Sequence, residues 1–124
     1  MKFFFAENID RVDPHYNFIN DQSGGGPKVF GHELFPEPPF DGLLVSRATV
    51  ESSKSRCTQS ERLQIKREGI RSFLRFPHAD YPIIGDCGSF SASPGCSEFE
   101  LEGTYDFYQE TGFDYGVSPD LIVP

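Results

Sequence analysis

The stretch of sequence that decides the fold is YPIIGDCGSF, residues 81–90. Its apolar run, residues 81–84, is short and continuous, which is typical of a parallel-sheet strand that is covered on both faces. Asp86 follows this run, and in barrels and open α/β sheets the chemistry takes place at the carboxyl ends of strands. An Asp in this position also commonly caps a turn or a helix. The stretch therefore predicts a buried strand and makes Asp86 a candidate functional residue, with capping as the alternative.

Two similar runs lie on either side of this stretch. GLLVS at residues 42–46 predicts another buried strand, which ends at Ser46, and residues 113–117 predict a third interior strand. Asp120 comes just after this third run. Because the carboxyl ends of parallel strands meet at one edge of a sheet, we expect Ser46, Asp86 and Asp120 to face one pocket.

A helix with a clear start is predicted between the first two of these strands. TQSE at residues 58–61 matches a capping box, in which Thr58 and Glu61 satisfy each other's exposed backbone N–H groups. Apolar residues follow at helical spacing, while Gly69 weakens the helix by about 1 kcal/mol relative to Ala. The expected apolar stripe consists of Leu63, Ile70 and Leu74, with Phe73 beside it.

A second helix is predicted over residues 99–111, with Gly112 as its left-handed cap. Its expected apolar face carries Leu101, Tyr105 and Tyr108. Residues 3–5 predict one further strand at the start of the chain. The order of strands and helices, with a repeat of about 30–40 residues, is that of βαβ units with parallel strands and right-handed crossovers. The predicted fold class is therefore α/β, with parallel strands and helical crossovers.

The length of 124 residues allows one domain, residues 1–124. Residues 8–40 hold clusters of Gly and Pro, so we expect this region to be a long loop outside the packed structure. The net charge of −8 argues against nonspecific nucleic-acid binding by the whole chain. Residues 54–75 nevertheless hold seven Lys and Arg against two Glu. This basic segment either meets a phosphate backbone or forms a solvated helix face.

The sequence indicates neither a metal site nor a membrane segment. Cys57, Cys87 and Cys96 form no CxxC pair, and the three His residues supply no ligand spacing with them. We therefore expect no disulfide framework, no metal and no cofactor in this chain. No apolar run is long enough to span a bilayer, and the run at residues 3–6 is too short for the apolar region of an export signal. We expect a cytoplasmic protein without a membrane partner.

Three segments carry a family resemblance: DGLLVS at residues 41–46, GDCGSFS at residues 85–91 and GFDYGVSPD at residues 112–120. They resemble the tRNA-guanine transglycosylase superfamily, and most closely its branch that inserts 7-deazaguanine bases into DNA. The resemblance covers nearly the whole chain. It implies a (β/α)8 TIM barrel, of which this chain would be the N-terminal part. It also implies a reaction that breaks a guanine N-glycosidic bond and installs a deazaguanine base.

The resemblance further implies the residues of a site. Asp86 with Ser89 and Phe90 matches the family's Asp-Ser-Gly-Gly-Phe motif, which binds the base and assists proton transfer; Cys87 replaces its first Ser. Asp120 matches a later Asp that recognises the base. A carboxylate accepts hydrogen bonds from a purine edge, an aromatic ring stacks on the base, and glycine permits close approach. The expected substrate-binding set is Ser46, Asp86, Cys87, Gly88, Ser89, Phe90 and Asp120, with Asp86 also catalytic.

The nucleophilic Asp and the Cys/His zinc site of the family lie in its second half, and neither is found in these residues. The chain is therefore expected to supply base recognition. Its expected partners are guanine or a 7-deazaguanine base, a nucleic acid (DNA before tRNA), and a missing C-terminal half or a second copy of the chain.

Two alternatives to this interpretation stay open. A non-catalytic fragment or split-barrel subunit would bind a base or a partner. A Cys protease would use Cys87 as its nucleophile, because GDCGS at residues 85–89 echoes the Gly-Asp-Ser-Gly-Gly of chymotrypsin-type enzymes. The helical patterns argue against the all-β barrel that such a protease requires.

Overall fold

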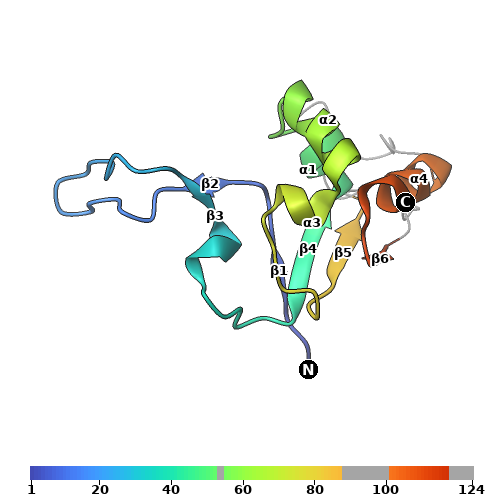
Figure 1. The fold of residues 1–124 in the computed structure, drawn as a ribbon, viewed down its shortest axis with the longest axis horizontal. Coiled ribbons are helices and arrows are strands. Elements are labelled where there is room, and N and C mark those ends of the chain that lie inside the picture. The colour runs from blue at the N-terminus through green and yellow to red at the C-terminus, as the bar shows by residue number, and fades with distance from the viewer. Residues whose placement is uncertain (53–54, 88–100, 118–124) are drawn as a thin grey trace, which may run out of the picture.

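Parallel strands form the centre of the structure (Figure 1). The computed structural model describes residues 1–52, 55–87 and 101–117. Within these residues the sheet is four-stranded, and each strand is parallel to its neighbour. The strands lie in the order β1 (Phe4–Ala6), β4 (Gly42–Ser46), β5 (Ile83–Asp86) and β6 (Tyr115–Gly116). The parallel α/β fold class expected from the apolar runs is thus confirmed.

Helices connect the strands, as the βαβ pattern predicts. Between β4 and β5 lie α1 (Arg47–Glu51), α2 (Gln59–Glu68) and α3 (Ile70–Phe73), and between β5 and β6 lies α4 (Leu101–Thr111). The short helix α1 was not expected from the sequence. No helix in the described ranges has both the length and the apolar character needed to cross a bilayer.

The apolar core lies on one face of the sheet. Leu43 of β4 and Ile83 of β5 are paired in register, and both are fully buried. They join a cluster that includes Ile65, Ile70 and Phe107 from the helices. Since successive side chains of a strand point to opposite faces, the neighbouring Leu44 and Ile84 lie on the other face and are only partly buried.

The region of residues 8–40 contains more packed structure than the expected long loop. β2 (Arg11–Val12) and β3 (Val29–Phe30) pair as an antiparallel ribbon, and the 3-10 helix η1 (Gly31–Leu34) follows. Ile9, Phe30 and His32 are buried. The expectation of an unpacked loop was wrong for the two ends of this region, because their apolar and aromatic side chains contribute to the core.

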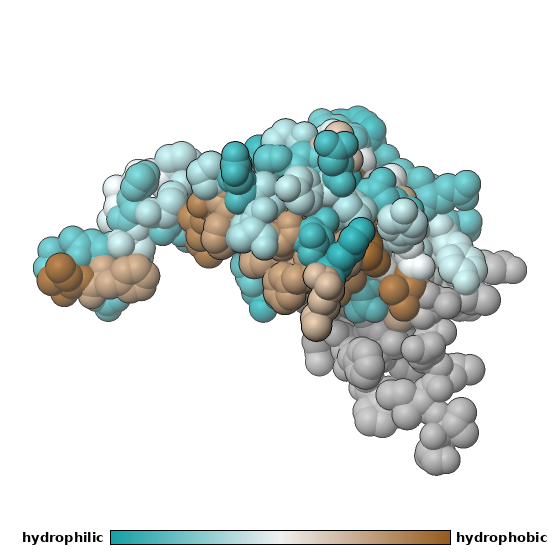
Figure 2. Space-filling view, turned by 90° about the horizontal axis from the view of Figure 1, so that it is seen from below, coloured by the Kyte–Doolittle hydropathy of each residue, from teal (hydrophilic) through white to brown (hydrophobic). Residues whose placement is uncertain are grey.

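The middle of this region projects as an arm, which extends to the left in Figure 1. Near its end, Asn17 and Gln22 form an isolated antiparallel bridge around a turn. Phe18 and Ile19 in this turn are 86% and 95% exposed. Figure 2 accordingly shows apolar surface at the far end of the arm.

The helix predicted after the capping box begins as expected but divides at Gly69. Thr58 and Glu61 form the capping box at the start of α2. Gly69 has a φ of +90°, a backbone conformation that L side chains rarely adopt, and it ends α2 before α3 begins. Leu63 is exposed, and Ile65 is buried instead. The predicted stripe was therefore wrong at Leu63, because the break changes which side of α2 faces the core.

The last helix and strand also differ in part from the predictions. Gly112 has a φ of +76° and follows α4 as expected. Tyr105 of α4 is exposed, whereas Thr104, Phe107, Tyr108 and Thr111 are buried, so Tyr105 was wrongly assigned to the apolar face. β6 was predicted as an interior strand, but it forms the edge of the described sheet, and its Tyr115 is exposed.

Candidate functional site

Ser46 and Asp86 meet at the carboxyl edge of the sheet. Ser46 is the last residue of β4, Asp86 is the last residue of β5, and the two are direct partners in the parallel register. Residues paired in this way project to the same face. The structure thus brings together two of the three residues that the sequence assigned to one pocket.

The Ser46 side chain has a structural role at this edge. Its hydroxyl oxygen accepts a hydrogen bond from the Ala48 backbone N–H at 3.2 Å, and Ser46 is the N-cap of α1. A capping hydroxyl satisfies one of the backbone N–H groups that the first turn of a helix leaves without a partner. Ser46 therefore fixes the direction in which the chain leaves β4.

Asp86 is partly buried, and its carboxylate faces few partners. Within the described part of the chain, its one hydrogen-bonding neighbour is the Cys87 thiol, whose Sγ lies 3.9 Å from Asp86 Oδ1. The described residues give Asp86 no helix or turn to cap. A carboxylate at the end of a buried strand that retains most of its acceptor capacity is available to a ligand with N–H donors.

A close contact between Tyr108 and two glycines holds β5 and β6 in place. A Cβ on Gly85 would lie 2.3 Å from the Tyr108 ring, and a Cβ on Gly116 would lie 2.1 Å from it, so neither position admits a side chain without a shift. The Tyr108 hydroxyl donates a hydrogen bond to the Val117 carbonyl at 2.8 Å. Burial above all raises the pKa of Tyr108 far above its usual value, and the nearby Asp86 carboxylate adds to this effect. Tyr108 therefore stays a neutral donor beside Asp86.

Arg47 adds a positive charge next to Ser46. Its Nε lies 2.9 Å from the Glu51 carboxylate and its Nη1 donates to the Thr104 hydroxyl at 3.0 Å. Arg47 thus connects α1 with α4 behind the carboxyl edge. Arg47 was not predicted, because nothing in the local sequence separates it from the other basic residues.

A second residue at the same edge was also missed. Glu7 directly follows β1, is 2% exposed, and its carboxylate lies 2.8 Å from His32 Nδ1. The opposite ring nitrogen of His32 lies 2.8 Å from the Leu74 carbonyl. A carboxylate placed just after a strand was the signal used for Asp86, and the same signal at residues 3–7 would have found Glu7.

The remaining predicted site residues lie outside the described residues. They are Gly88, Ser89, Phe90 and Asp120.

The described residues contain no side-chain cluster that would form the Cys/His zinc site of the resembled family. Within residues 1–52, 55–87 and 101–117, no three His, Cys, Asp or Glu side chains gather closely enough to hold a metal ion. Burial raises the pKa of the Cys57 thiol to about 11, which disfavours the thiolate that zinc requires. His32 is already engaged by Glu7 and Leu74.

The protease alternative does not suit this geometry. Cys87 is 3% exposed, and the sheet that carries it is parallel, with helical crossovers, whereas the motif it echoes belongs to an antiparallel barrel. A buried thiol in this position is difficult for a peptide substrate to reach.

The basic segment is mostly neutralised by acidic neighbours. Within the described residues, ion pairs join Arg56 to Asp10, Lys66 to Glu51, Arg67 to Glu68, Arg71 to Asp114 and Arg75 to Glu33. Three of these acids lie far away in the sequence: Asp10 and Glu33 belong to the packed ends of residues 8–40, and Asp114 lies directly before β6. Much of the segment is therefore a salt-bridged surface.

The parallel sheet with its helical connections defines an α/β protein, and the partly buried Asp86 lies at the edge where such sheets bind ligands. No family model matches the sequence. A search of curated proteins finds a DNA-guanine transglycosylase of Salmonella montevideo that is 33% identical over 132 aligned residues. The alignment covers 99% of this chain and 31% of that protein, so the chain spans about a third of its relative's length. The chain is thus related to the transglycosylase family, as its motifs indicated.

Proposed function

We propose that this chain is the base-recognition part of a guanine transglycosylase that exchanges guanine for a 7-deazaguanine base in DNA. The observation that carries the proposal is the position of Asp86, at the carboxyl end of a parallel strand in a chain related to a DNA-guanine transglycosylase. The name of that relative supports guanine and DNA as substrates.

The chemistry of a carboxylate suits this task. The Watson–Crick edge of guanine presents a ring N–H and the exocyclic NH₂ side by side, and an ionised carboxylate can accept hydrogen bonds from both. Adenine presents a donor beside an acceptor at the same edge, so a carboxylate binds it less well. Partial burial strengthens these hydrogen bonds by excluding water. We assign Asp86 the role of accepting hydrogen bonds from the base and of assisting proton transfer.

The other expected residues complete the proposed site. We assign Ser89 and Phe90 to base binding and stacking, Gly88 to close approach of the base, and Asp120 to further recognition of its edge. Cys87 donates toward Asp86 and helps to position that carboxylate. Ser46 contributes through the start of α1, which it caps beside Asp86.

We further propose that the four parallel strands are part of a (β/α)8 barrel. β1 and β6 are the outer strands of the described sheet, and the face opposite the core carries Leu44, Ile84 and the exposed Tyr115. In a closed barrel this face would point to the interior, where alternate strands contribute layers of side chains. The remaining barrel strands would supply the nucleophile.

Binding of the free base tests the proposal. In equilibrium dialysis with radiolabelled guanine, Asp86→Asn should weaken binding by about 10-fold or more, because charge-assisted hydrogen bonds contribute roughly 1.5–3 kcal/mol. The amide keeps the shape of the side chain but presents an NH₂ donor to the donors of guanine. Asp106→Asn, at an exposed position of α4, removes the same charge and should leave the affinity unchanged. Equal affinities for the two variants would contradict the assignment.

A further inference from the structure

The outer side of α2 forms a shallow hollow with basic and apolar walls. Its volume is about 350 Å³, and it is lined by Gln59, Arg62, Leu63 and Lys66. The spacing of three and four residues places these side chains on one side of the helix. Leu63 is 61% exposed here. The hollow thus combines an apolar side chain with two cations, in a chain with a net charge of −8.

Arg62 in this hollow lacks the partners that the other arginines have. Its Nε–H is buried and has no hydrogen-bond acceptor. Within the described residues it also takes part in no ion pair, in contrast to Arg71 and Arg75 nearby in the sequence. A buried donor without an acceptor costs free energy, more so on a charged group. An anion bound at the hollow would instead pair with the guanidinium charge, which no carboxylate within the described residues neutralises.

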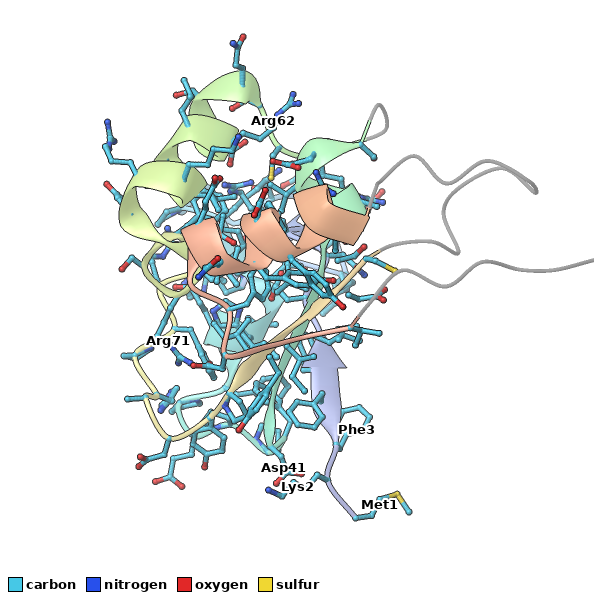
Figure 3. All side chains as sticks on the ribbon, turned by 90° about the vertical axis from the view of Figure 1, so that its right-hand side faces the viewer. Met1, Lys2, Phe3, Asp41, Arg62 and Arg71 are labelled. Atoms are coloured by element: carbon cyan, nitrogen blue, oxygen red, sulfur yellow. The ribbon has the colours of Figure 1, made fainter. Side chains whose placement is uncertain are left out.

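The hollow lies on the same side of the molecule as the proposed base site. In Figure 3, Arg62 is at the opposite end of the molecule from Met1, Lys2, Phe3 and Asp41. These four residues mark the amino ends of the strands, since Phe3 precedes β1 and Asp41 precedes β4. Arg62 is therefore toward the carboxyl edge, where Asp86 ends β5. A nucleic acid that presents a base to Asp86 would pass along this side.

We propose that the outer side of α2 binds the phosphodiester backbone of DNA. This inference rests on the proposed function and adds the surface that holds the substrate. The Arg62 guanidinium donates to a phosphate oxygen, Gln59 donates through its amide, and Leu63 contacts the sugar. Lys66 contributes a second positive charge; its Nζ is 3.6 Å from Glu51, on a side chain that is half exposed and free to reorient. Charge complementarity with DNA selects this occupant for the hollow.

Salt-dependent DNA binding tests the proposal. The affinity of the chain for a fluorescein-labelled duplex would be measured by anisotropy from 25 to 200 mM NaCl, conditions that resolve counterion release. Arg62→Gln and Lys66→Gln should each weaken binding several-fold and reduce the slope of log affinity against log salt by about 1. Arg67→Gln is the matched control, since Arg67 lies on the same helix, is 77% exposed and pairs with Glu68. Arg67→Gln should bind DNA within about 2-fold of the unmodified chain.

Two results would overturn the inference. One is an Arg62→Gln slope equal to that of Arg67→Gln, and the other is no salt-dependent binding by the unmodified chain at 25 mM NaCl. Guanine dialysis of Asp86→Asn, together with the salt titration of Arg62→Gln, distinguishes a failure of this inference from a failure of the proposed function. If Asp86→Asn weakens guanine binding while Arg62→Gln leaves the salt slope of DNA binding unchanged, only the assignment of the α2 surface is wrong. If Asp86→Asn leaves guanine binding unchanged while Arg62→Gln reduces the salt slope, the assignment of the base site is wrong and the assignment of the DNA-binding surface is supported.

Discussion

At the scale of single residues, the pair of Glu7 and His32 joins two distant parts of the chain. Glu7 follows β1, His32 lies in η1, and the ring of His32 reaches the carbonyl of Leu74 after α3. The Leu74 carbonyl can only accept, so the facing ring nitrogen carries a proton. The other ring nitrogen of His32 lies 2.8 Å from the Glu7 carboxylate. This arrangement fixes the base of the arm against the core.

Removal of His32 should destabilise the protein strongly. His32→Ala leaves the Glu7 carboxylate buried without its partner and opens a cavity, and breaking a buried pair costs about 3–5 kcal/mol. Urea unfolding followed by circular dichroism would measure the change in the free energy of unfolding. His78→Ala serves as the control, because His78 contacts Phe76 and Tyr81 at the surface side of the core and has no buried carboxylate. A loss below about 1 kcal/mol for His32→Ala would show that the pair is not structural.

Cys57 should make stability fall at alkaline pH. Burial first, and the negative charge of Glu61 second, raise the pKa of this thiol from 9.0 to about 11 in the folded protein. Because the unfolded chain releases this proton at lower pH, the contribution is complete below pH 9 and is lost as pH rises from about 9 to 11. The expected loss is on the order of 1–2 kcal/mol. Thermal unfolding of the unmodified protein and of Cys57→Ala at pH 8 and pH 10.5 would measure it; identical pH dependence would contradict the burial argument.

At the scale of elements, the packing of α4 on the sheet depends on glycine. Gly85→Ala would place a Cβ 2.3 Å from the Tyr108 ring and force the helix away from β5. We expect the free energy of unfolding to fall by about 1–3 kcal/mol, as for other overpacked sites. In a Tyr108→Leu background the same substitution should cost much less, since the smaller side chain leaves room. Chemical denaturation of the four proteins of this double-mutant cycle gives the coupling, and additive effects would contradict the contact.

The sequence predicted the strands of the sheet well, for a physical reason. The continuous apolar runs that became β4 and β5 are what a strand between two covered faces requires, so pattern and environment agree. The capping box at Thr58 and Glu61 was equally readable, because it depends on local contacts. Leu63 and Tyr105 were misassigned because their faces depend on how α2 and α4 dock against the sheet. A period of 3.6 residues cannot supply that information once Gly69 interrupts the pattern.

Residues 8–40 and the candidate site also contain features that a local sequence pattern cannot predict. β2 and β3 have two residues each and pair across a long intervening loop, so no local pattern reveals them. Asp86 was found from its place after a strand, and its register with Ser46 follows directly from parallel pairing. The capping of α1 by Ser46 and the isolation of the Arg62 guanidinium depend on contacts in three dimensions. The sequence therefore predicted that Ser46 and Asp86 lie at the carboxyl edge of the sheet, and the structure added the contacts that they make there.

At the scale of the whole molecule, the candidate site lies at one edge of the sheet and a purely structural contact lies at the other. The amino edge, marked by Phe3 and Asp41 in Figure 3, is closed by the hydrogen bonds between these two residues. The carboxyl edge carries Ser46 and Asp86, and the start of α2 lies on the same side. If base recognition and backbone binding both occur on this side, one approach of the nucleic acid serves both.

The central claim is that a guanine-type base binds at Asp86 on the carboxyl edge. The most direct measurement is a titration of the ¹⁵N-labelled chain with 7-deazaguanine, followed by the backbone amide signals. We predict progressive shifts for Ser46, Arg47, Asp86 and Cys87, and unchanged signals for Phe3 and Asp41 at the amino edge. Asp86→Asn should abolish these shifts, whereas Asp106→Asn should preserve them. Shifts at the amino edge, or shifts that persist in Asp86→Asn, would contradict binding at Asp86.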